Sequence, residues 1–228
     1  MIKTLFKDTA LFCKAHFFSM LLILMPIFIL IEGTSIIYAL NFAHLLNESP
    51  ITVQVIPILL DFLGYPIYIS ALILYIASVN AGKALGVKDA LRHSLRYYIP
   101  MLIVAILTTI GIIFGLILLI IPGLLLLVKW AFTELEVVLN NKTPIEAMKQ
   151  SWQKTKGYMA TLLFGFLFIT LITEVSIYII ESVFSHYIFT NIATELIYIP
   201  FYMLIATYAF HVYQISTSRQ AEELITQE

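Results

Sequence analysis

Charged residues are scarce in this sequence. They make up 12% of its 228 residues, about half of the roughly 25% that is usual in soluble domains. Hydrophobic residues account for 61%, and the mean hydropathy is +0.95. A soluble chain of this size needs a polar shell around its core, and so few charges cannot form one. The composition therefore argues against soluble enzymes, secreted disulfide scaffolds and disordered proteins, and favours a protein surrounded by lipid.

Cysteine, net charge and catalytic motifs are also lacking. Cys13 is the only cysteine, so the chain can form neither an internal disulfide nor a cysteine metal cage. A formal net charge of −1 gives no overall field that would attract nucleic acid. Walker A, GxSxG, HExxH and Rossmann signatures do not occur. We therefore expect no enzymatic activity, no cofactor, no metal and no nucleic-acid partner.

Long apolar runs are what the sequence does contain, and they predict six membrane-spanning helices. The longest run, Tyr97–Leu139, is too long for a single span, and we expect a hairpin turn at Pro122-Gly123 because proline ends a helix and glycine permits a turn. The fold class expected is an all-α membrane protein of three helical hairpins. The predicted spans cover approximately residues 15–41, 52–79, 97–121, 124–139, 158–180 and 195–215.

Lysine and arginine predict the orientation. Six spans place 12 of the 13 basic residues on one side, in the N-terminal segment, two internal loops and the C-terminal tail. The opposite loops, residues 42–51 and 182–194, contain none. Because basic loops stay in the cytoplasm, we expect both termini there.

The two basic internal loops resemble each other. Residues 89–95 align class by class with residues 146–152, and each segment has the spacing of a short amphipathic helix. In the second helix Ile145, Met148 and Trp152 form the apolar face. In the first helix the residues that share the apolar face are Val87, Ala90, Leu91, Ser94, Leu95 and Tyr98. Thr143, Pro144 and Glu146 have the pattern of a helix cap, with a capping box.

A weaker amphipathic segment precedes the first span, so each hairpin follows one in-plane cytoplasmic helix. We expect a single polytopic domain over 1–228, with repeat-like units at about 1–80, 81–140 and 141–216 and a polar tail at 217–228. The basic residues of these helices serve either topology and anchoring, or recognition of anionic lipid headgroups or a membrane-protein partner. The candidate headgroup-binding residues are Lys88, Arg92, Arg96, Lys149, Lys154 and Lys156.

Charged residues inside predicted spans form a second candidate site, because ionisable groups are costly in lipid. The predicted topology places all of them in the outer half of the bilayer. Either Lys129 forms a buried ion pair with one or two of the acids, or the group lines a cavity for a solute or headgroup. The candidate cluster is Glu32, Asp61, Lys129, Glu174 and Glu181.

Other polar and small residues have simpler interpretations. Glu134 and Glu136 lie near the basic loop, where helix-end salt bridges explain them. Gly111 and Gly115 form a GxxxG pattern that lets helices approach closely, and we expect it to pack against the following span.

The stretch from Ile121 through Gly123, followed by a span and then Pro144–Trp152, resembles a signature of bacterial membrane domains, including the membrane region of some glycerophosphodiester phosphodiesterases. The closer resemblance is to the YciC-like family of enterobacterial inner-membrane proteins, whose N-terminus is similar to Phe6–Thr9. The resemblance implies a six-span protein of a Gram-negative inner membrane, and it brings no catalytic residues. The soluble phosphodiesterase domain is missing, so that activity does not transfer.

Three functions are compatible with these patterns. The first is a non-enzymatic lipid- or partner-binding role in envelope or membrane homeostasis. The second is a small transporter or channel that uses an outward-facing acidic cavity. The third, an intramembrane enzyme acting on lipid, would need a catalytic constellation that the sequence does not display.

Overall fold

The computed structural model describes residues 2–42, 50–183 and 187–225, and these residues contain helices and no strand. The expected all-α class is confirmed. The helices are α1 (Ile2–Ala15), α2 (Phe17–Phe42), α3 (Pro50–Asn80), α4 (Val87–Ser94), a 3-10 turn (Leu95–Tyr97), α5 (Tyr98–Leu118), α6 (Ile120–Lys129), α7 (Thr133–Asn140), α8 (Pro144–Lys154), α9 (Met159–Val183) and α10 (Tyr187–Ile225).

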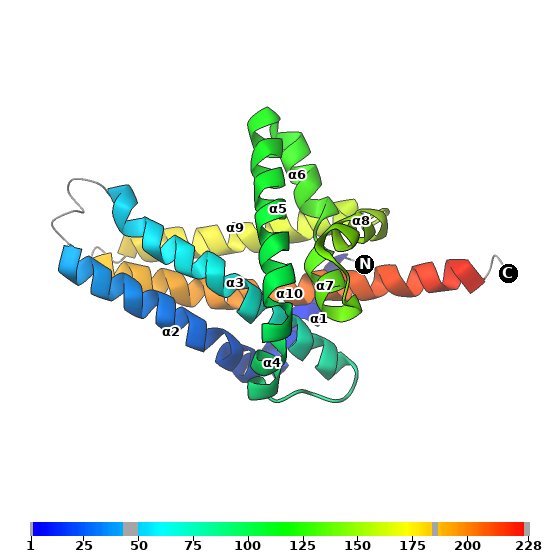
Figure 1. Cartoon of the computed structure of the whole chain (residues 1–228), viewed down its shortest axis with the longest axis horizontal. Coiled ribbons are helices and arrows are strands. Elements are labelled where there is room, and N and C mark those ends of the chain that lie inside the picture. The colour runs from blue at the N-terminus through cyan, green and yellow to red at the C-terminus, as the bar shows by residue number, and fades with distance from the viewer. Residues whose placement is uncertain (1, 43–49, 184–186, 226–228) are drawn as a thin grey trace.

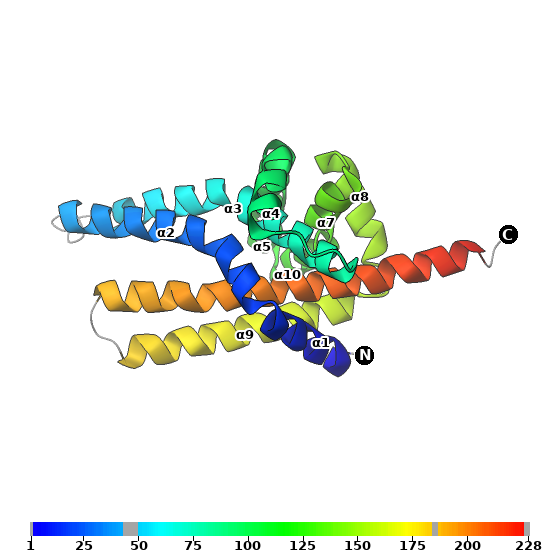
Figure 2. The ribbon, with the colours of Figure 1, turned by 90° about the horizontal axis from the view of Figure 1, so that it is seen from below.

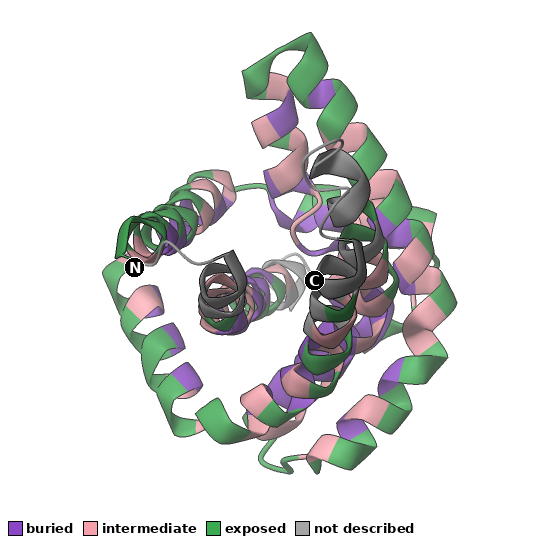
Figure 3. Ribbon diagram, turned by 90° about the vertical axis from the view of Figure 1, so that its left-hand side faces the viewer, coloured by how far each residue is buried: buried purple, intermediate pink, exposed green. Residues whose placement is uncertain are grey.

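Four long helices form a bundle of two layers, with α2 and α3 in one layer and α9 and α10 in the other (Figures 1 and 2). Helix α10 contacts both α2 and α3 and thereby joins the layers. Side chains such as Met20 of α2 and Leu72 of α3 are fully buried, and the buried ring of Tyr208 packs between α10 and α9. In Figure 3, which looks along the bundle, buried residues gather where helices face one another.

The α5–α6 hairpin runs across the direction of the four bundle helices (Figures 1 and 2). Its turn is at Leu119, whose extended backbone (φ −165°, ψ 148°) separates the two helices. The predicted turn at Pro122-Gly123 is therefore misplaced by a few residues. Pro122 lies in the first turn of α6, where the missing N–H would have had no helical partner in any case.

Gly123 does not form the turn, and it allows α6 to pack closely against α5. A Cβ at this residue would lie 2.5 Å from the Leu116 side chain and 2.8 Å from its backbone nitrogen. On the opposite helix, a Cβ at Gly115 would lie 2.9 Å from the Gly123 Cα. Gly111 faces the Trp130 ring in the same way, at 2.5 Å. The expectation that the GxxxG pattern packs against the following helix is confirmed.

The predicted fourth span, 124–139, is not one helix. Helix α6 ends at Lys129 and α7 begins at Thr133, so residues 130–132 interrupt it. Helix α7 then ends before Asn141, which adopts the left-handed conformation (φ 51°) that commonly closes a helix.

By length and composition, four described helices are able to cross a membrane, or five if the bent pair α1–α2 forms one span. The bend between Ile2–Ala15 and the first part of α2 is 74°. Large apolar side chains remain exposed on the outer faces, such as Phe18 (77% exposed) and Ile121 (79%). These features are compatible with a membrane protein. The four helical stretches are Ile58–Asn80, Val87–Leu118, Met159–Val183 and Leu196–Gln220.

The two amphipathic helices of the basic loops exist as α4 and α8. In α4 the predicted faces hold for the residues inside the helix, since Ala90 and Ser94 are buried while Lys88 and Arg92 are exposed. In α8 the predicted apolar face points away from the rest of the protein, which is compatible with the contact with lipid expected of it. Ile145 and Trp152 are exposed, and the residues that pack into the protein are Ala147, Ser151 and Lys154.

Candidate functional site

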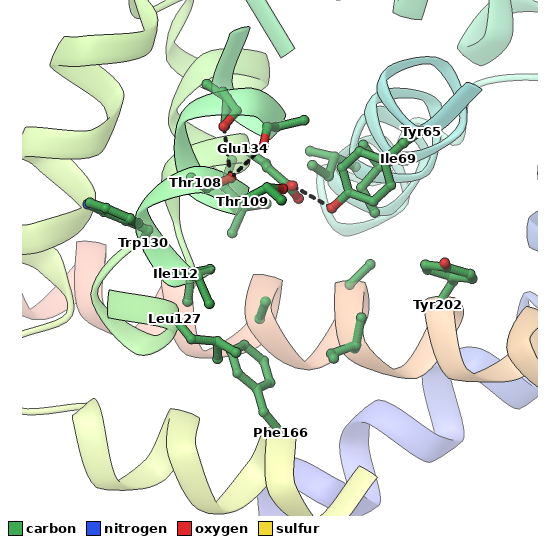
Figure 4. Close-up of a pocket in the computed structure, with 18 of the residues that line it drawn as sticks. Tyr65, Ile69, Thr108, Thr109, Ile112, Leu127, Trp130, Glu134, Phe166 and Tyr202 are labelled. Carbon is green, nitrogen blue, oxygen red and sulfur yellow. Dashed lines mark hydrogen bonds between the residues drawn. The ribbon is translucent and has the colours of Figure 1, made fainter. Parts of the chain in front are cut away.

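A cavity of about 560 Å³ lies between the bundle and the segment from α5 to α7 (Figure 4). Helices α3, α9 and α10 supply the bundle side, and the cavity is partly open to its surroundings. Its lining residues are Ile58, Asp61, Phe62, Tyr65, Ile69, Ile73, Val104, Ala105, Thr108, Thr109, Ile112, Leu127, Trp130, Ala131, Glu134, Leu135, Phe166, Thr170, Phe201, Tyr202, Ile205, Ala206 and Ala209.

Two carboxyl groups provide the strongest polarity of this cavity. Tyr65 of α3 donates a hydrogen bond of 2.5 Å to Oε1 of Glu134 on α7, and the two side chains point toward each other in Figure 4. Tyr68 donates a hydrogen bond of 3.1 Å to Oδ1 of Asp61. Asp61 and Tyr65 are four residues apart on α3, so they lie on one face of that helix. Lysine, arginine and histidine do not occur among the residues that line the cavity.

The rest of the lining is apolar or aromatic, with a few hydroxyl groups. Phe166 of α9 and Tyr202 of α10 approach from the bundle side, opposite Trp130 at the end of α6 (Figure 4). The Thr108 hydroxyl donates to the Val104 carbonyl at 2.8 Å, which leaves its oxygen able to accept a hydrogen bond. The cavity therefore suits a molecule with an apolar body and one polar end.

Among the members of the predicted intramembrane cluster whose side chains the structure describes, one lines this cavity. That residue is Asp61. Glu174 and Glu181 are exposed on α9, and the Glu32 side chain falls outside the described residues. The described part of the chain thus does not gather these acids around Lys129.

Lys129 is buried and directed toward α8. Its ammonium group donates to the Trp152 carbonyl at 3.4 Å and lies 5.3 Å from the centroid of the Trp152 ring. A carbonyl and an aromatic face are favourable partners for an ammonium group. No ion pair between Lys129 and an acid occurs among the described residues.

Glu134 provides the second carboxyl group of the cavity, and the sequence did not place it in a site. A helix-end salt bridge was expected for it, and its partner is the hydroxyl of Tyr65, 69 positions earlier in the chain. No local pattern links two positions that far apart.

Glu136 does form the expected salt bridge, and its partner is Lys154, at 2.6 Å. Glu136 is fully buried, and the pair is completed by Tyr213 and Asn140, which donate hydrogen bonds to the Glu136 carboxylate at 3.0 and 2.7 Å. Burial lowers the pKa of Lys154, but hydrogen bonds to Glu136 and Tyr213 outweigh it, so the pKa lies above its usual value. Lys154 therefore carries its positive charge at neutral pH.

Lys154 is consequently not a headgroup-binding residue, because its ammonium group is buried and paired inside the protein. The other candidate basic side chains reach the surface or lie close to it. For these residues headgroup binding remains a prediction. The exposed candidates are Lys88, Arg92, Arg96, Lys149 and Lys156.

Ser151 explains why α8 turns this face inward. Its hydroxyl accepts a hydrogen bond from the Phe132 N–H at 3.0 Å and donates one to the Lys129 carbonyl at 2.7 Å. These two backbone groups lie at the break between α6 and α7. In a continuous helix they would form hydrogen bonds within the helix instead. Polar backbone groups in an apolar setting need such partners, so the face of α8 that carries Ser151 packs into the protein.

The predicted cap of α8 is confirmed. Thr143 and Glu146 form a capping box, with Pro144 in the first turn, and Glu146 Oε2 accepts from the Thr143 N–H at 3.2 Å. The hydrogen bond from the Thr143 side chain, followed by the one from its backbone, holds the pKa of Glu146 below its usual value.

The fold and the cavity define a helical protein with several membrane-capable helices and one mixed apolar and acidic cavity. The family DUF7847, described as a domain of unknown function, matches residues 103–216, which is half of the chain, and the chain belongs to this family. The match covers most of α5 and everything from α6 through α9, together with much of α10. No curated protein and no solved structure matches the chain.

Proposed function

We propose that this protein is a non-enzymatic membrane protein that binds an amphipathic, lipid-like molecule in the cavity between α3, α5, α7 and α10. The cavity itself carries the proposal. Its volume of about 560 Å³ falls within the roughly 300–1,000 Å³ of small-molecule sites. Most of its lining is apolar, and its polar groups are concentrated at Asp61, Tyr65 and Glu134.

The membrane and topology belong to the same proposal. We place the protein in a bacterial inner membrane, with six membrane segments in three hairpins and both termini in the cytoplasm. The distribution of basic residues supports this orientation. The resemblance to YciC-like proteins supports the choice of membrane.

The second hairpin is the unusual one. Helix α6 has 10 residues, so it is about 15 Å long, half of the roughly 30 Å hydrocarbon thickness. Because the hairpin also runs across the bundle helices, we propose that α5 and α6 enter the membrane obliquely from the cytoplasmic side and return to it. The basic segments before α5 and after α7 then share one side, as the charge distribution requires.

The exposed basic residues of α4 and α8 suit contact with anionic headgroups on the cytoplasmic side. Ile145 and Trp152, exposed on α8, are available for the interface beneath them. Such contacts fit a role in envelope or membrane homeostasis, through lipids or through a membrane-protein partner.

Ligand retention tests the proposal. The full chain is purified from its native membrane in a mild detergent, and bound small molecules are measured by native mass spectrometry. Thr109→Trp places a large ring at a residue that lines the cavity. Ile110→Trp is the matched control, because Ile110 is exposed like its neighbour Thr109 but does not line the cavity.

We expect a lipid-like molecule in the wild-type chain and in Ile110→Trp, and its loss from Thr109→Trp. Retention that is equal in all three proteins, or an empty wild-type chain, would contradict the proposal.

Transport is the second candidate, favoured by carboxyl groups in a cavity that is partly open. It requires passage of the ligand across the membrane in addition to binding. Efflux or uptake by proteoliposomes that Thr109→Trp abolishes would favour transport, and retention without movement would favour simple binding.

A further inference from the structure

We infer that the ligand of this cavity carries a positive charge, and that its cationic end is held between Asp61 and Glu134. The inference rests on the proposed binding function and adds the chemical class of the ligand: an organic cation, such as an ammonium group, on an apolar body.

Charge balance is the first argument. The cavity contains two carboxyl groups and no basic side chain among its lining residues. Each carboxyl accepts one tyrosine hydroxyl, which satisfies one oxygen without neutralising the group. A buried charge without a counter-charge costs several kcal/mol, and a cationic ligand would supply the missing one.

The protein's own nearby cations are engaged elsewhere. Lys129 is directed to the Trp152 carbonyl and ring, and Lys154 is paired with Glu136. Neither residue lines the cavity. An ionised Asp61 or Glu134 therefore has no basic partner among the residues that line the cavity, and a cationic ligand would supply one.

Aromatic rings are the second argument. Tyr65, Phe166 and Tyr202 line the same cavity as the two carboxyl groups, and Figure 4 shows Tyr65 beside Glu134. The faces of aromatic rings attract organic cations, and they do so more strongly where water is excluded. Carboxylates and ring faces together favour a large, weakly hydrated cation over a metal ion, which prefers several oxygen ligands.

The apolar walls are the third argument. The remaining space is lined by aliphatic side chains, which form no hydrogen bonds. They include Ile69, Val104, Ile112 and Ile205. A small hydrophilic cation would leave this surface unfilled, whereas an amphipathic cation would cover it. The chemistry fits both a lipid with an amine headgroup and a free lipophilic cation.

Tetraphenylphosphonium and tetraphenylborate test the inference, because they have nearly the same size and shape and opposite charges. Binding of each ion to the purified full chain is measured by equilibrium dialysis in one detergent. We expect the wild type to bind the phosphonium at least about tenfold more tightly than the borate. Thr109→Trp should weaken the binding of both ions.

Asp61→Asn combined with Glu134→Gln should remove the preference for the cation, because both changes keep size and hydrogen bonding. Asp61→Asn alone provides the test if the double variant does not fold, and it should reduce the preference. Glu174→Gln is the matched control, since Glu174 is exposed and lies outside the cavity. It should behave as the wild type.

Equal binding of both ions by the wild type, or an unchanged preference in Asp61→Asn and in the double variant, would overturn the inference. The proposed function would survive if the native chain still retained a neutral or anionic ligand that Thr109→Trp loses. Competition by vesicles of phosphatidylethanolamine, but not of phosphatidylglycerol, would identify a lipid amine as the source of the charge. Absence of such competition would identify a free cation.

Discussion

At the scale of single residues, the buried pair Glu136–Lys154 connects three helices. Glu136 belongs to α7 and Lys154 to α8, while Tyr213 of α10 hydrogen-bonds both. A buried pair is weak evidence for stability, because desolvation offsets its attraction. Removing either residue alone, however, leaves the charge of the other buried and unpaired.

Glu136→Ala should therefore destabilise the chain by about 3–5 kcal/mol, since it leaves Lys154 charged and buried. Replacing both residues, as Glu136→Leu with Lys154→Met, should restore most of the lost stability. Thermal unfolding of the purified proteins measures both effects. A double variant as unstable as Glu136→Ala would contradict this account of the pair.

The sequence located several of these residues but could not assign their partners. The capping box of α8 was predictable because all of its members lie within four positions. The contact between Tyr65 and Glu134 spans 69 positions, and the burial of Lys154 depends on an acid 18 positions earlier and a tyrosine 59 positions later. From its charge alone, such a lysine is expected at the surface. Whether it is buried instead depends on its partners in the tertiary structure.

At the scale of elements, the α5–α6 hairpin depends on the close approach of Gly115 and Gly123. A methyl group at Gly123 would meet both the side chain and the backbone of Leu116. Backbone cannot move aside as a side chain can, so the helices would have to separate.

Gly123→Ala should destabilise the hairpin by about 1–3 kcal/mol, the usual cost of overpacking. Gly33→Ala is the matched control, because a Cβ there has nothing within 4 Å and alanine favours the helix. Melting temperatures of the two variants in one detergent provide the comparison. Equal stability of both would show that the glycines do not set the helix separation.

Element boundaries were predicted less well than the elements. The length of an apolar run indicates that a segment is helical and lies in lipid or protein, and the predicted runs do fall on helices of the structure. It contains no information on whether residues 130–132 continue a helix, because apolar residues are compatible with both outcomes. The break exists because Ser151, on another helix, provides the hydrogen bonds that the ladder gives up.

At the scale of the whole molecule, the orientation of the chain is the main expectation. His93 of α4 and Ser182 of α9 are both exposed and belong to opposite sides of the proposed topology. Single cysteines at these positions, in a Cys13→Ser background, report the side of the membrane directly.

In intact spheroplasts, a membrane-impermeant maleimide should label Ser182→Cys and should label His93→Cys only after permeabilisation. The positive-inside distribution is the physical reason, since the loop around His93 is rich in lysine and arginine. Labelling of both cysteines from the same side would contradict the proposed topology.

The interruption at residues 130–132 has a consequence for the order of assembly. Ser151 follows Phe132 by 19 residues, so the ribosome makes the second hairpin before it makes the serine that hydrogen-bonds to the interruption. Until that moment the Phe132 N–H and the Lys129 carbonyl must be hydrated or held by the insertion machinery. Helices α6 and α7 therefore reach their final packing only after α8 has been synthesised. The middle of the fold is completed when about two thirds of the chain has been made.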